Sequence, residues 1–209
     1  MFQTVAAFIV FLAWGSMILG LLAQRNRGAH VIVRRAPVSK LGIVLQGVAF
    51  AAVFGIRQRP VAFFAGPWGF DARALSVVAD LCALTGAALV IWSQRTLGAQ
   101  WSVSARLLAD HQLITTGPYR YVRHPIYSAM MLLMIAVGLA LTMPRVLGAA
   151  LVVYLLGTLV RIRSEEALMR DAFGSEFERY RQRVPALLPV RLGADARRGR
   201  PARYNREHR

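Results

Sequence analysis

The side chains that could do chemistry gather in two short segments of the chain. The first segment, residues 117–127, has the sequence GPYRYVRHPIY, and the second, residues 161–166, has the sequence RIRSEE. Proline suits the first position of a helix, where its missing N–H is no loss, so we expect a helix to start at His124-Pro125. The free N–H groups at such a helix end favour an anionic group or another hydrogen-bond acceptor.

Charges of both signs occur close together in the second segment. Arg161 and Glu165 are one helical turn apart on one face, and Arg163 and Glu166 form a neighbouring pair. Exposed pairs of this kind contribute little to stability. One interpretation is therefore a set of surface ion pairs, and the other is a polar pocket that the charged side chains line. The residues alone leave both interpretations open.

Long apolar blocks surround both segments and must position them. Apolar residues make up 56% and charged residues 17% of the 209 residues, against roughly 45–50% and about 25% in ordinary soluble domains. A membrane-spanning helix needs about 20 mostly apolar residues. The candidate spans are Val5–Ala23, Leu41–Ile56, Leu75–Ser93, Ile126–Met143 and Val146–Val160, of which only the third carries a charge, Asp80. We predict an all-α integral membrane protein with about five transmembrane helices; the shorter blocks could alternatively be buried helices of a soluble core.

The blocks also predict how the chain is divided. Residues 1–93 hold the first three spans, and residues 191–209 form a basic disordered tail. Residues 94–190 form a core with three parts: a cytoplasmic segment, a helical hairpin over 126–160 that turns at Pro144-Arg145, and cytoplasmic helices over 161–184 that break at Gly174.

Basic residues supply the orientation of the predicted spans. The chain has 26 Lys and Arg against 10 Asp and Glu, and a formal net charge of +16. Most of the basic residues fall between spans one and two, between spans three and four, and after span five. Because positive charge marks the cytoplasmic side, we expect an inner or cytoplasmic membrane protein with its N-terminus outside and its C-terminus in the cytoplasm. Topology and contact with anionic lipids account for the charge, so we expect no nucleic-acid partner.

The order of the motifs resembles the isoprenylcysteine carboxyl methyltransferase family. These are integral membrane enzymes that use S-adenosylmethionine. The resemblance lies in GPYRYVRHPIY, then RIRSEE after one helical hairpin, then Phe173-Gly174 and Tyr180. It covers roughly His111 to Pro189, and the N-terminal half matches only as hydrophobic spans.

The resemblance implies a set of site residues. The segment that flanks the adenosyl moiety would be His111, Gln112, Leu113 and Ile114, and the motif that wraps the cofactor would be Tyr119, His124, Pro125, Ile126 and Tyr127. Glu165 resembles the acidic residue that binds the cofactor, and Glu166 completes the pair. Arg161 stands where the family has a catalytic arginine that handles the substrate carboxylate. No metal is implied. Two departures are Ala129, in place of a frequent glycine, and Ser104, in place of glutamine in some members.

The expected chemistry agrees with these roles. S-adenosylmethionine carries a sulfonium, an ammonium and a carboxylate, so Glu165 could neutralise a positive group while Arg123 or helix N–H groups meet the carboxylate. A substrate carboxylate is already ionised at neutral pH, so its methylation needs positioning and removal of water rather than a strong base. The resemblance therefore implies O-methylation of a lipophilic small-molecule or lipidated acceptor from the membrane.

Three alternatives stay open at this stage. Methylation of an amine, as on a phospholipid headgroup, would need a base such as His124 or a glutamate. A membrane reductase of similar architecture would use a dinucleotide. A non-catalytic membrane scaffold is the third alternative, and Ala129 is the feature that keeps it open. The sequence does not indicate an oligomeric state.

Overall fold

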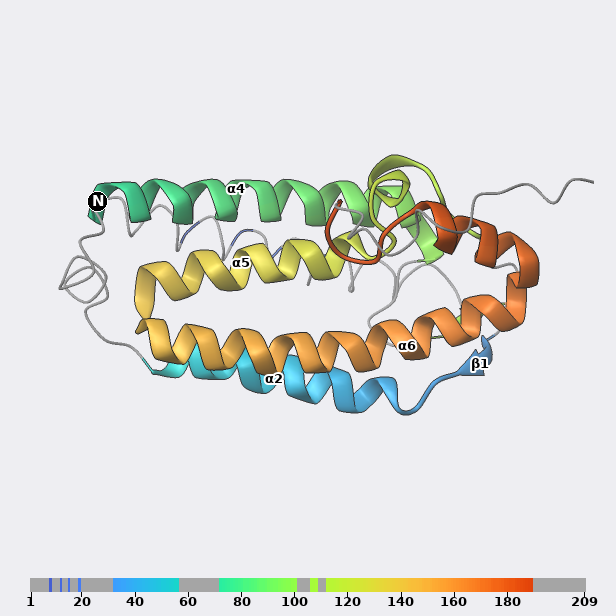
Figure 1. Ribbon diagram of the computed structural model, residues 1–209, viewed down its shortest axis with the longest axis horizontal. Coiled ribbons are helices and arrows are strands. Elements are labelled where there is room, and N and C mark those ends of the chain that lie inside the picture. Colours follow the sequence, from blue (N-terminus) through green and yellow to red (C-terminus); the bar gives the residue numbers. More distant parts are fainter. Residues whose placement is uncertain are drawn as a thin grey trace, which may run out of the picture.

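The computed structural model describes residues 32–56, 72–100, 106–108 and 112–189, together with the single positions 8, 12, 15 and 19. Its elements in chain order are β1 (Ile32–Arg35), α2 (Ser39–Gly55), α4 (Ala72–Leu97), the 3-10 turn η1 (Gly98–Gln100), β2 (Arg106–Leu108), the 3-10 turn η2 (Gly117–Arg120), α5 (Pro125–Leu141) and α6 (Pro144–Arg183). The four α-helices of the described residues lie side by side in an elongated bundle (Figure 1).

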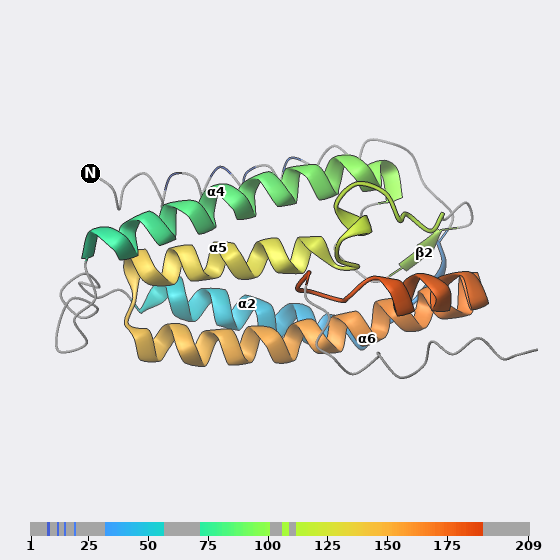
Figure 2. The same cartoon turned by 45° about the horizontal axis from the view of Figure 1, so that its top comes forward.

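Two helix pairs make up the bundle. α2 lies along α6, and α4 lies along α5, in both views of the ribbon (Figures 1 and 2). α5 ends at Leu141 and α6 begins at Pro144, so the predicted helical hairpin is confirmed. Proline occupies the first turn of both helices, as its lack of an N–H favours.

Two of the described helices are long and apolar enough to cross a membrane, over Ala74–Leu97 and Pro144–Arg183. α2 and α5 are apolar but shorter, at 17 residues each. These four helices correspond to the second to fifth predicted spans. The first predicted span, Val5–Ala23, lies outside the described residues except for the four single positions, so the number of five spans stays a prediction.

Apolar side chains cover the outside of the bundle as well as its inside. The core contains fully buried residues such as Val53, Ala83 and Leu133. Large apolar side chains are also exposed along three helices: Leu41, Val44 and Val48 on α2, Val77, Val78, Leu81 and Leu84 on α4, and Val152, Leu156 and Leu159 on α6. A helix on the surface of a soluble protein places polar residues on its outer face. The pattern is typical of helices that face lipid, and it argues against the alternative of a soluble core.

A short two-stranded sheet, which the sequence did not predict, adds to the predicted helical fold. β1 pairs with β2 in antiparallel orientation, with Ile32 opposite Leu108 and Arg35 opposite Arg106. The strands have four and three residues, too few for an alternating pattern to be visible in the sequence. The pairing joins the segment before α2 to the segment after α4, so these two predicted inside segments lie at the same end of the bundle.

α2 and α6 approach each other closely at a pair of glycines. A Cβ atom at Gly42 would lie 2.5 Å from the carbonyl oxygen of Gly157 and 2.5 Å from Cγ of Arg161. A Cβ atom at Gly157 would lie 2.8 Å from the carbonyl oxygen of Gly42. Small residues allow membrane helices to pack backbone against backbone. The glycine contact therefore fixes the base of the Arg161 side chain against α2.

α6 continues beyond its apolar part and then folds back. Gly174 has φ +48° and ψ −120°, a conformation that favours glycine, and the helix direction changes there (Figure 1). The returning part carries Phe177 and Tyr180, both buried. The Tyr180 hydroxyl donates a hydrogen bond to the carbonyl oxygen of Tyr119, at 2.6 Å. The predicted break at Gly174 is confirmed, and it brings the end of α6 onto the segment before α5.

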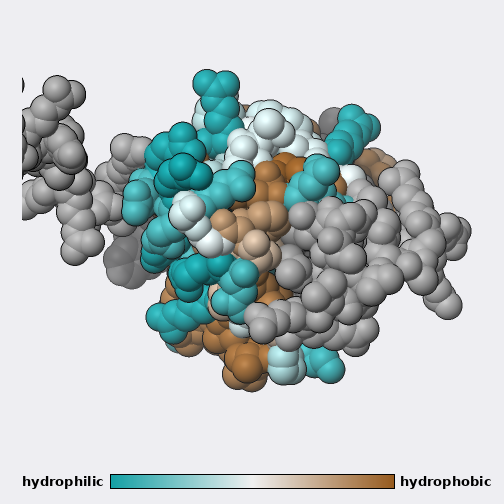
Figure 3. All heavy atoms as spheres, turned by 90° about the vertical axis from the view of Figure 1, so that its right-hand side faces the viewer, coloured by the Kyte–Doolittle hydropathy of each residue, from teal (hydrophilic) through white to brown (hydrophobic). Residues whose placement is uncertain are grey.

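Hydrophilic side chains gather at this end of the bundle. Figure 3 looks onto it and shows them over much of the described surface, with apolar patches between them. The polar end contains residues 117–127 and 161–166, the two segments that hold the chemistry-bearing side chains.

Candidate active site

The two chemistry-bearing segments meet where α5 begins and where the apolar part of α6 ends. His124 is the N-cap residue of α5 and Pro125 its first residue, as predicted. The backbone N–H groups of Arg123 and His124 donate hydrogen bonds to the carbonyl oxygens of Pro185 and Ala186, each at 2.9 Å. The chain beyond α6 therefore holds the start of α5 against α6.

Arg161, Tyr127 and Glu165 form the first half of the polar cluster. Arg161 Nε donates a hydrogen bond to the Tyr127 hydroxyl at 2.6 Å, and Arg161 Nη2 donates to Glu165 Oε1 at 3.2 Å. The Tyr127 hydroxyl donates to the same carboxylate oxygen. The guanidinium carbon of Arg161 lies 5.1 Å from the centre of the Tyr127 ring, close enough for a cation–π contact. Arg161 is 5% exposed, so this is a buried arrangement.

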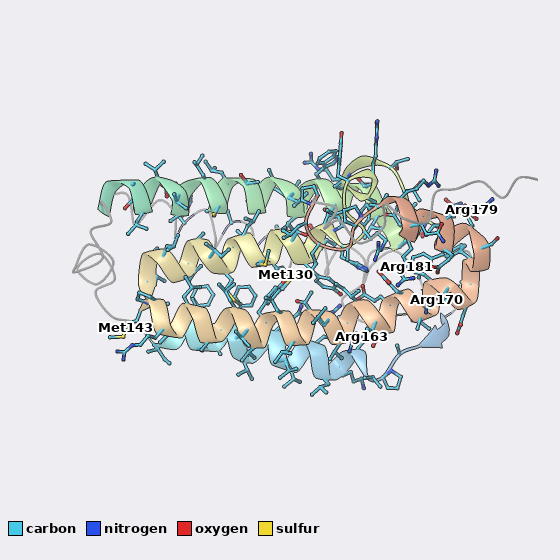
Figure 4. The ribbon with its side chains drawn as sticks, viewed as in Figure 1. Met130, Met143, Arg163, Arg170, Arg179 and Arg181 are labelled. Atoms are coloured by element: carbon cyan, nitrogen blue, oxygen red, sulfur yellow. The ribbon has the colours of Figure 1, made fainter. Side chains whose placement is uncertain are left out.

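Glu166 is the centre of the second half. Arg123 Nη2 lies 2.8 Å from Glu166 Oε1, and Arg181 Nε lies 3.4 Å from Glu166 Oε2. Arg181 comes from the part of α6 that folds back (Figure 4). The predicted pairing of Glu166 with Arg163 is wrong, because Arg163 is exposed and the cations on Glu166 come from residues distant in sequence.

His124 connects the two halves. Its Nε2 lies 3.2 Å from Glu166 Oε1 and its Nδ1 lies 3.6 Å from Glu165 Oε2. The imidazole also stacks on the Tyr127 ring, with centroids 5.7 Å apart and an interplanar angle of 18°. Because Arg161 and Glu166 are buried, the interpretation of these charges as exposed surface pairs is wrong for both of them.

The charges of the cluster shift its pKa values, and these three groups lie outside the apolar parts of α5 and α6. Burial lowers the pKa of His124, but hydrogen bonds and charge from Glu165 and Glu166 outweigh it, so the pKa is raised. Burial raises the pKa of Glu166, but His124 and Arg123 outweigh it and bring the pKa to about 2. The pKa of Glu165 is lowered despite its burial, by His124 and Arg161 above all. At neutral pH both glutamates are therefore ionised.

The raised pKa of His124 predicts a pH-dependent stability. A group whose pKa is higher in the folded state stabilises the fold fully below its unfolded pKa, about 6.5 for histidine. That contribution is lost as the pH rises through the folded pKa of His124. We expect the melting temperature in detergent to fall as the pH is raised from 6 to 9, and we expect His124→Gln to remove most of this slope. An equal slope in the variant would contradict the ion pairing of His124.

The other sequence-predicted residues that the structure describes take no part in the hydrogen bonds and ion pairs of the cluster. The backbone N–H of Gln112 donates to Gln100 Oε1 at 3.0 Å, and the Gln112 side chain is exposed. Burial, and next the charge of Glu165, raise the pKa of Tyr119, which is itself buried. The remaining predicted residues have apolar side chains that are half-buried or buried: Leu113, Ile114, Pro125 and Ile126. His111 and Ser104 lie outside the described residues.

Three residues of the cluster and its surroundings differ from the expectation or were not predicted from the sequence. Arg123, expected to face a cofactor carboxylate, is held by Glu166 and by the carbonyl oxygens of Arg181 and Val184. The Tyr154 hydroxyl donates to the carbonyl oxygen of Tyr127 at 2.7 Å from within the bundle. A tyrosine inside an otherwise apolar span was the available signal for this contact, whereas nothing local marks Arg181.

Residues 78–171 match the sequence profile of the isoprenylcysteine carboxyl methyltransferase family. The matched segment includes Arg123, His124, Tyr127, Arg161, Glu165 and Glu166, which are the residues of the cluster apart from Arg181. The match covers slightly less than half of the chain and includes both chemistry-bearing segments. The resemblance that the motifs predicted is thereby confirmed.

Relatives match this chain over part of their length. A protein-S-isoprenylcysteine O-methyltransferase of Schizosaccharomyces pombe is 33% identical over 90 residues, 42% of this chain and 37% of that protein. A protein of the same name in Saccharomyces cerevisiae is 30% identical over 125 residues, 54% of this chain and 52% of that protein. The cobalt-zinc-cadmium resistance protein CzcN of Cupriavidus metallidurans is 31% identical over 100 residues, 46% of this chain and 45% of that protein. The chain thus spans about half or less of the length of these relatives.

One oxygen of the family's paired glutamates is loosely engaged in this chain. Glu165 Oε1 accepts from Arg161 and Tyr127, whereas Oε2 has its nearest ion-pair partner within the described residues at 3.6 Å, beyond a good hydrogen bond. The Glu165 side chain is 25% exposed, against 9% for Glu166. Glu165 can therefore accept a further cationic donor, while Glu166 is already surrounded by cations. This asymmetry fits a ligand that carries an ammonium or sulfonium group.

Proposed function

We propose that the chain is an integral membrane methyltransferase that transfers a methyl group from S-adenosylmethionine to the carboxylate of a lipophilic acceptor. The observation that carries the proposal is the pairing of buried Arg161 with the partly open Glu165 through Tyr127. An anion-binding side chain and a cation-binding side chain stand next to each other there. A donor cation and an acceptor anion need such a pair to meet.

Glu165 would hold a positive group of S-adenosylmethionine, and His124 and Tyr127 would orient that carboxylate. The support lies in the Oε2 atom, whose ion-pair partner His124 is 3.6 Å away, and in the lowered pKa, which keeps Glu165 charged at neutral pH. When bound, S-adenosylmethionine supplies an electrophilic methyl carbon, which bonds to a carboxylate oxygen while the electron pair of the broken C–S bond stays on sulfur. Tyr119 and residues 111–114 would cover the adenosyl moiety.

Arg161 would position the acceptor carboxylate. Its planar guanidinium binds carboxylates through two N–H groups. Tyr127 and the glycine contact with α2 restrict where that guanidinium points. No proton is transferred in the reaction, so the chain needs to align the acceptor and exclude water, and it needs no free base.

The surrounding helices support a lipophilic acceptor from the membrane. The outward faces of α2, α4 and α6 are apolar, and the cluster lies at the end where these helices become polar. We place that end on the cytoplasmic side, with residues 1–93 as spans and 94–190 as the catalytic core. The relatives named protein-S-isoprenylcysteine O-methyltransferase favour an S-isoprenylcysteine as the acceptor.

The cluster offers less for an amine acceptor. Methylation of an amine needs a base to take up a proton. The raised pKa of His124 favours its protonated form, which cannot accept a proton, and the lowered pKa of each glutamate makes its carboxylate a weaker base. We therefore favour the carboxylate.

The test is the chemical identity of the product. Purified protein in lipid nanodiscs is incubated with methyl-labelled S-adenosylmethionine and N-acetyl-S-farnesylcysteine. We expect label in the lipid phase that alkali releases as volatile methanol, which is the behaviour of a methyl ester. Label that resists alkali would indicate an amine product, and no transferred label would contradict the proposed function.

A further inference from the structure

A buried hydroxyl on α2 has no hydrogen-bond partner among the described residues. Ser39 is 1% exposed, and its Oγ makes no hydrogen bond there. Leaving a buried polar group unsatisfied costs about 1–3 kcal/mol, and such groups are rare in folded proteins. The two other atoms of this kind in the described segments, Asp80 Oδ1 and Gln94 Nε2, are both on α4. We therefore expect the Ser39 hydroxyl to find its hydrogen-bond partner outside the described residues of this chain.

Ser39 lies on the face of α2 that packs against α6. The buried residues of α2 include Ser39, Gly42 and Gln46, and Gln46 Nε2 donates to Thr158 Oγ1 of α6 at 2.8 Å. Gly42, one turn beyond Ser39, is the residue that touches the Arg161 stem. α2 and α6 run in opposite directions (Figure 1). Residues that precede Gly42 in α2 therefore lie beside residues that follow Arg161 in α6, and Ser39 is on the Glu165 side of Gly42. The hydroxyl is thus on the Arg161 side of the bundle, near its polar end.

The hydroxyl is not used to begin the helix. The backbone N–H of Ser39 donates to the carbonyl oxygen of Ala36 at 3.1 Å, and the next two N–H groups donate to Pro37 and Val38. The N-cap residue of α2 is Val38, and Ser39 follows it as the first residue of the helix. The Ser39 hydroxyl therefore makes no capping hydrogen bond within the described residues.

We propose that Ser39 Oγ donates a hydrogen bond to the acceptor carboxylate that Arg161 positions. This inference rests on the proposed function and adds a specificity-determining residue from α2 to it. Serine and arginine would then both present donors, and a carboxylate has acceptors on both of its oxygens. A carboxamide has only one oxygen; when that oxygen meets Arg161, its NH₂ group can only donate a neutral hydrogen bond to the Ser39 hydroxyl, which contributes less than a bond to a charged carboxylate.

The experiment measures equilibrium binding of N-acetyl-S-farnesylcysteine and of its carboxamide to the full chain in nanodiscs. We expect the wild type to bind the carboxylate at least about 10-fold more tightly than the carboxamide, since hydrogen bonds to charged groups contribute about 1.5–3 kcal/mol. Ser39→Ala should weaken carboxylate binding about 10-fold and reduce the preference over the carboxamide. The affinity for S-adenosylmethionine should stay unchanged.

Ser93→Ala is the matched control. Ser93 is 0% exposed, and its hydroxyl donates to the carbonyl oxygen of Leu89 at 2.6 Å, so it is buried but satisfied. Ser93→Ala should leave carboxylate binding unchanged. In the ligand-free protein, Ser39→Ala should not lower the melting temperature, because no hydrogen bond is lost.

Two results would overturn the inference. One is unchanged carboxylate binding in Ser39→Ala. The other is a lower melting temperature of ligand-free Ser39→Ala together with equally weakened binding of the carboxylate and the carboxamide. The methyl-transfer assay reports separately on the proposed function. Absence of turnover with an intact Ser39-dependent preference would refute the proposed reaction and leave the carboxylate contact standing.

Discussion

Arg161→Lys should lower kcat/KM for a carboxylate acceptor by about 100-fold, which corresponds to roughly 3 kcal/mol of transition-state stabilisation. Lysine keeps the positive charge but has no planar fork, so it cannot contact the Tyr127 hydroxyl, Glu165 and a carboxylate together. In the wild type, Nε lies 2.6 Å from the Tyr127 hydroxyl and Nη2 lies 3.2 Å from Glu165. The measurement is the steady-state rate of label transfer at varied acceptor concentration.

Arg163→Lys is the control for this prediction. Arg163 is two residues away on α6 and exposed, so the same exchange should leave kcat/KM within about 2-fold of the wild type, as expected for a surface site. If Arg161→Lys also kept near-normal kcat/KM, Arg161 would not position the acceptor.

Glu166→Gln should destabilise the protein by about 3–5 kcal/mol, because removing one partner leaves buried charges unpaired. Glu166 is 7% exposed and lies within 3.4 Å of three cationic side chains, Arg123, His124 and Arg181. These come from the start of α5 and from the returning part of α6. Loss of the Glu166 charge should therefore weaken the contact between the start of α5 and the returning part of α6. The effect is measured as the shift of the denaturation curve in detergent at pH 7.

Glu178→Gln is the matched control for the stability effect. Glu178 lies 2.9 Å from Arg181 and 3.6 Å from Arg170, with 38% of its side chain exposed. Exposed pairs contribute about 0–1 kcal/mol, so this variant should melt close to the wild type. Equal shifts for the two variants would mean that Glu166 does not join the segments.

Local signals made part of the fold predictable. Pro125 and Pro144 mark the starts of α5 and α6, and Gly174 marks the change of direction in α6. Each acts through its own backbone geometry, so its effect does not depend on distant residues. The ion pair of Arg161 with Glu165 was likewise predictable from their spacing of one turn.

Contacts between distant segments were not predictable in this way. The partners of Glu166 come from positions 123, 124 and 181, and the Gly42–Gly157 contact joins helices far apart in the sequence. Residues 32–35 and 106–108 carry no local signal for a strand, and only their pairing with each other identifies them as strands. The role of Ser39 also depends on such a contact, because its hydroxyl is informative only once α2 lies against α6.

The central claim is that Glu165 holds S-adenosylmethionine in this cluster, and isothermal titration of the ligand into purified protein tests it most directly. We predict measurable binding to the wild type, at least about 10-fold weaker binding to Glu165→Gln, since a hydrogen bond to a charged group is lost, and unchanged binding to Glu178→Gln. Equal affinity in the wild type and Glu165→Gln, or no binding to the wild type, would contradict the account.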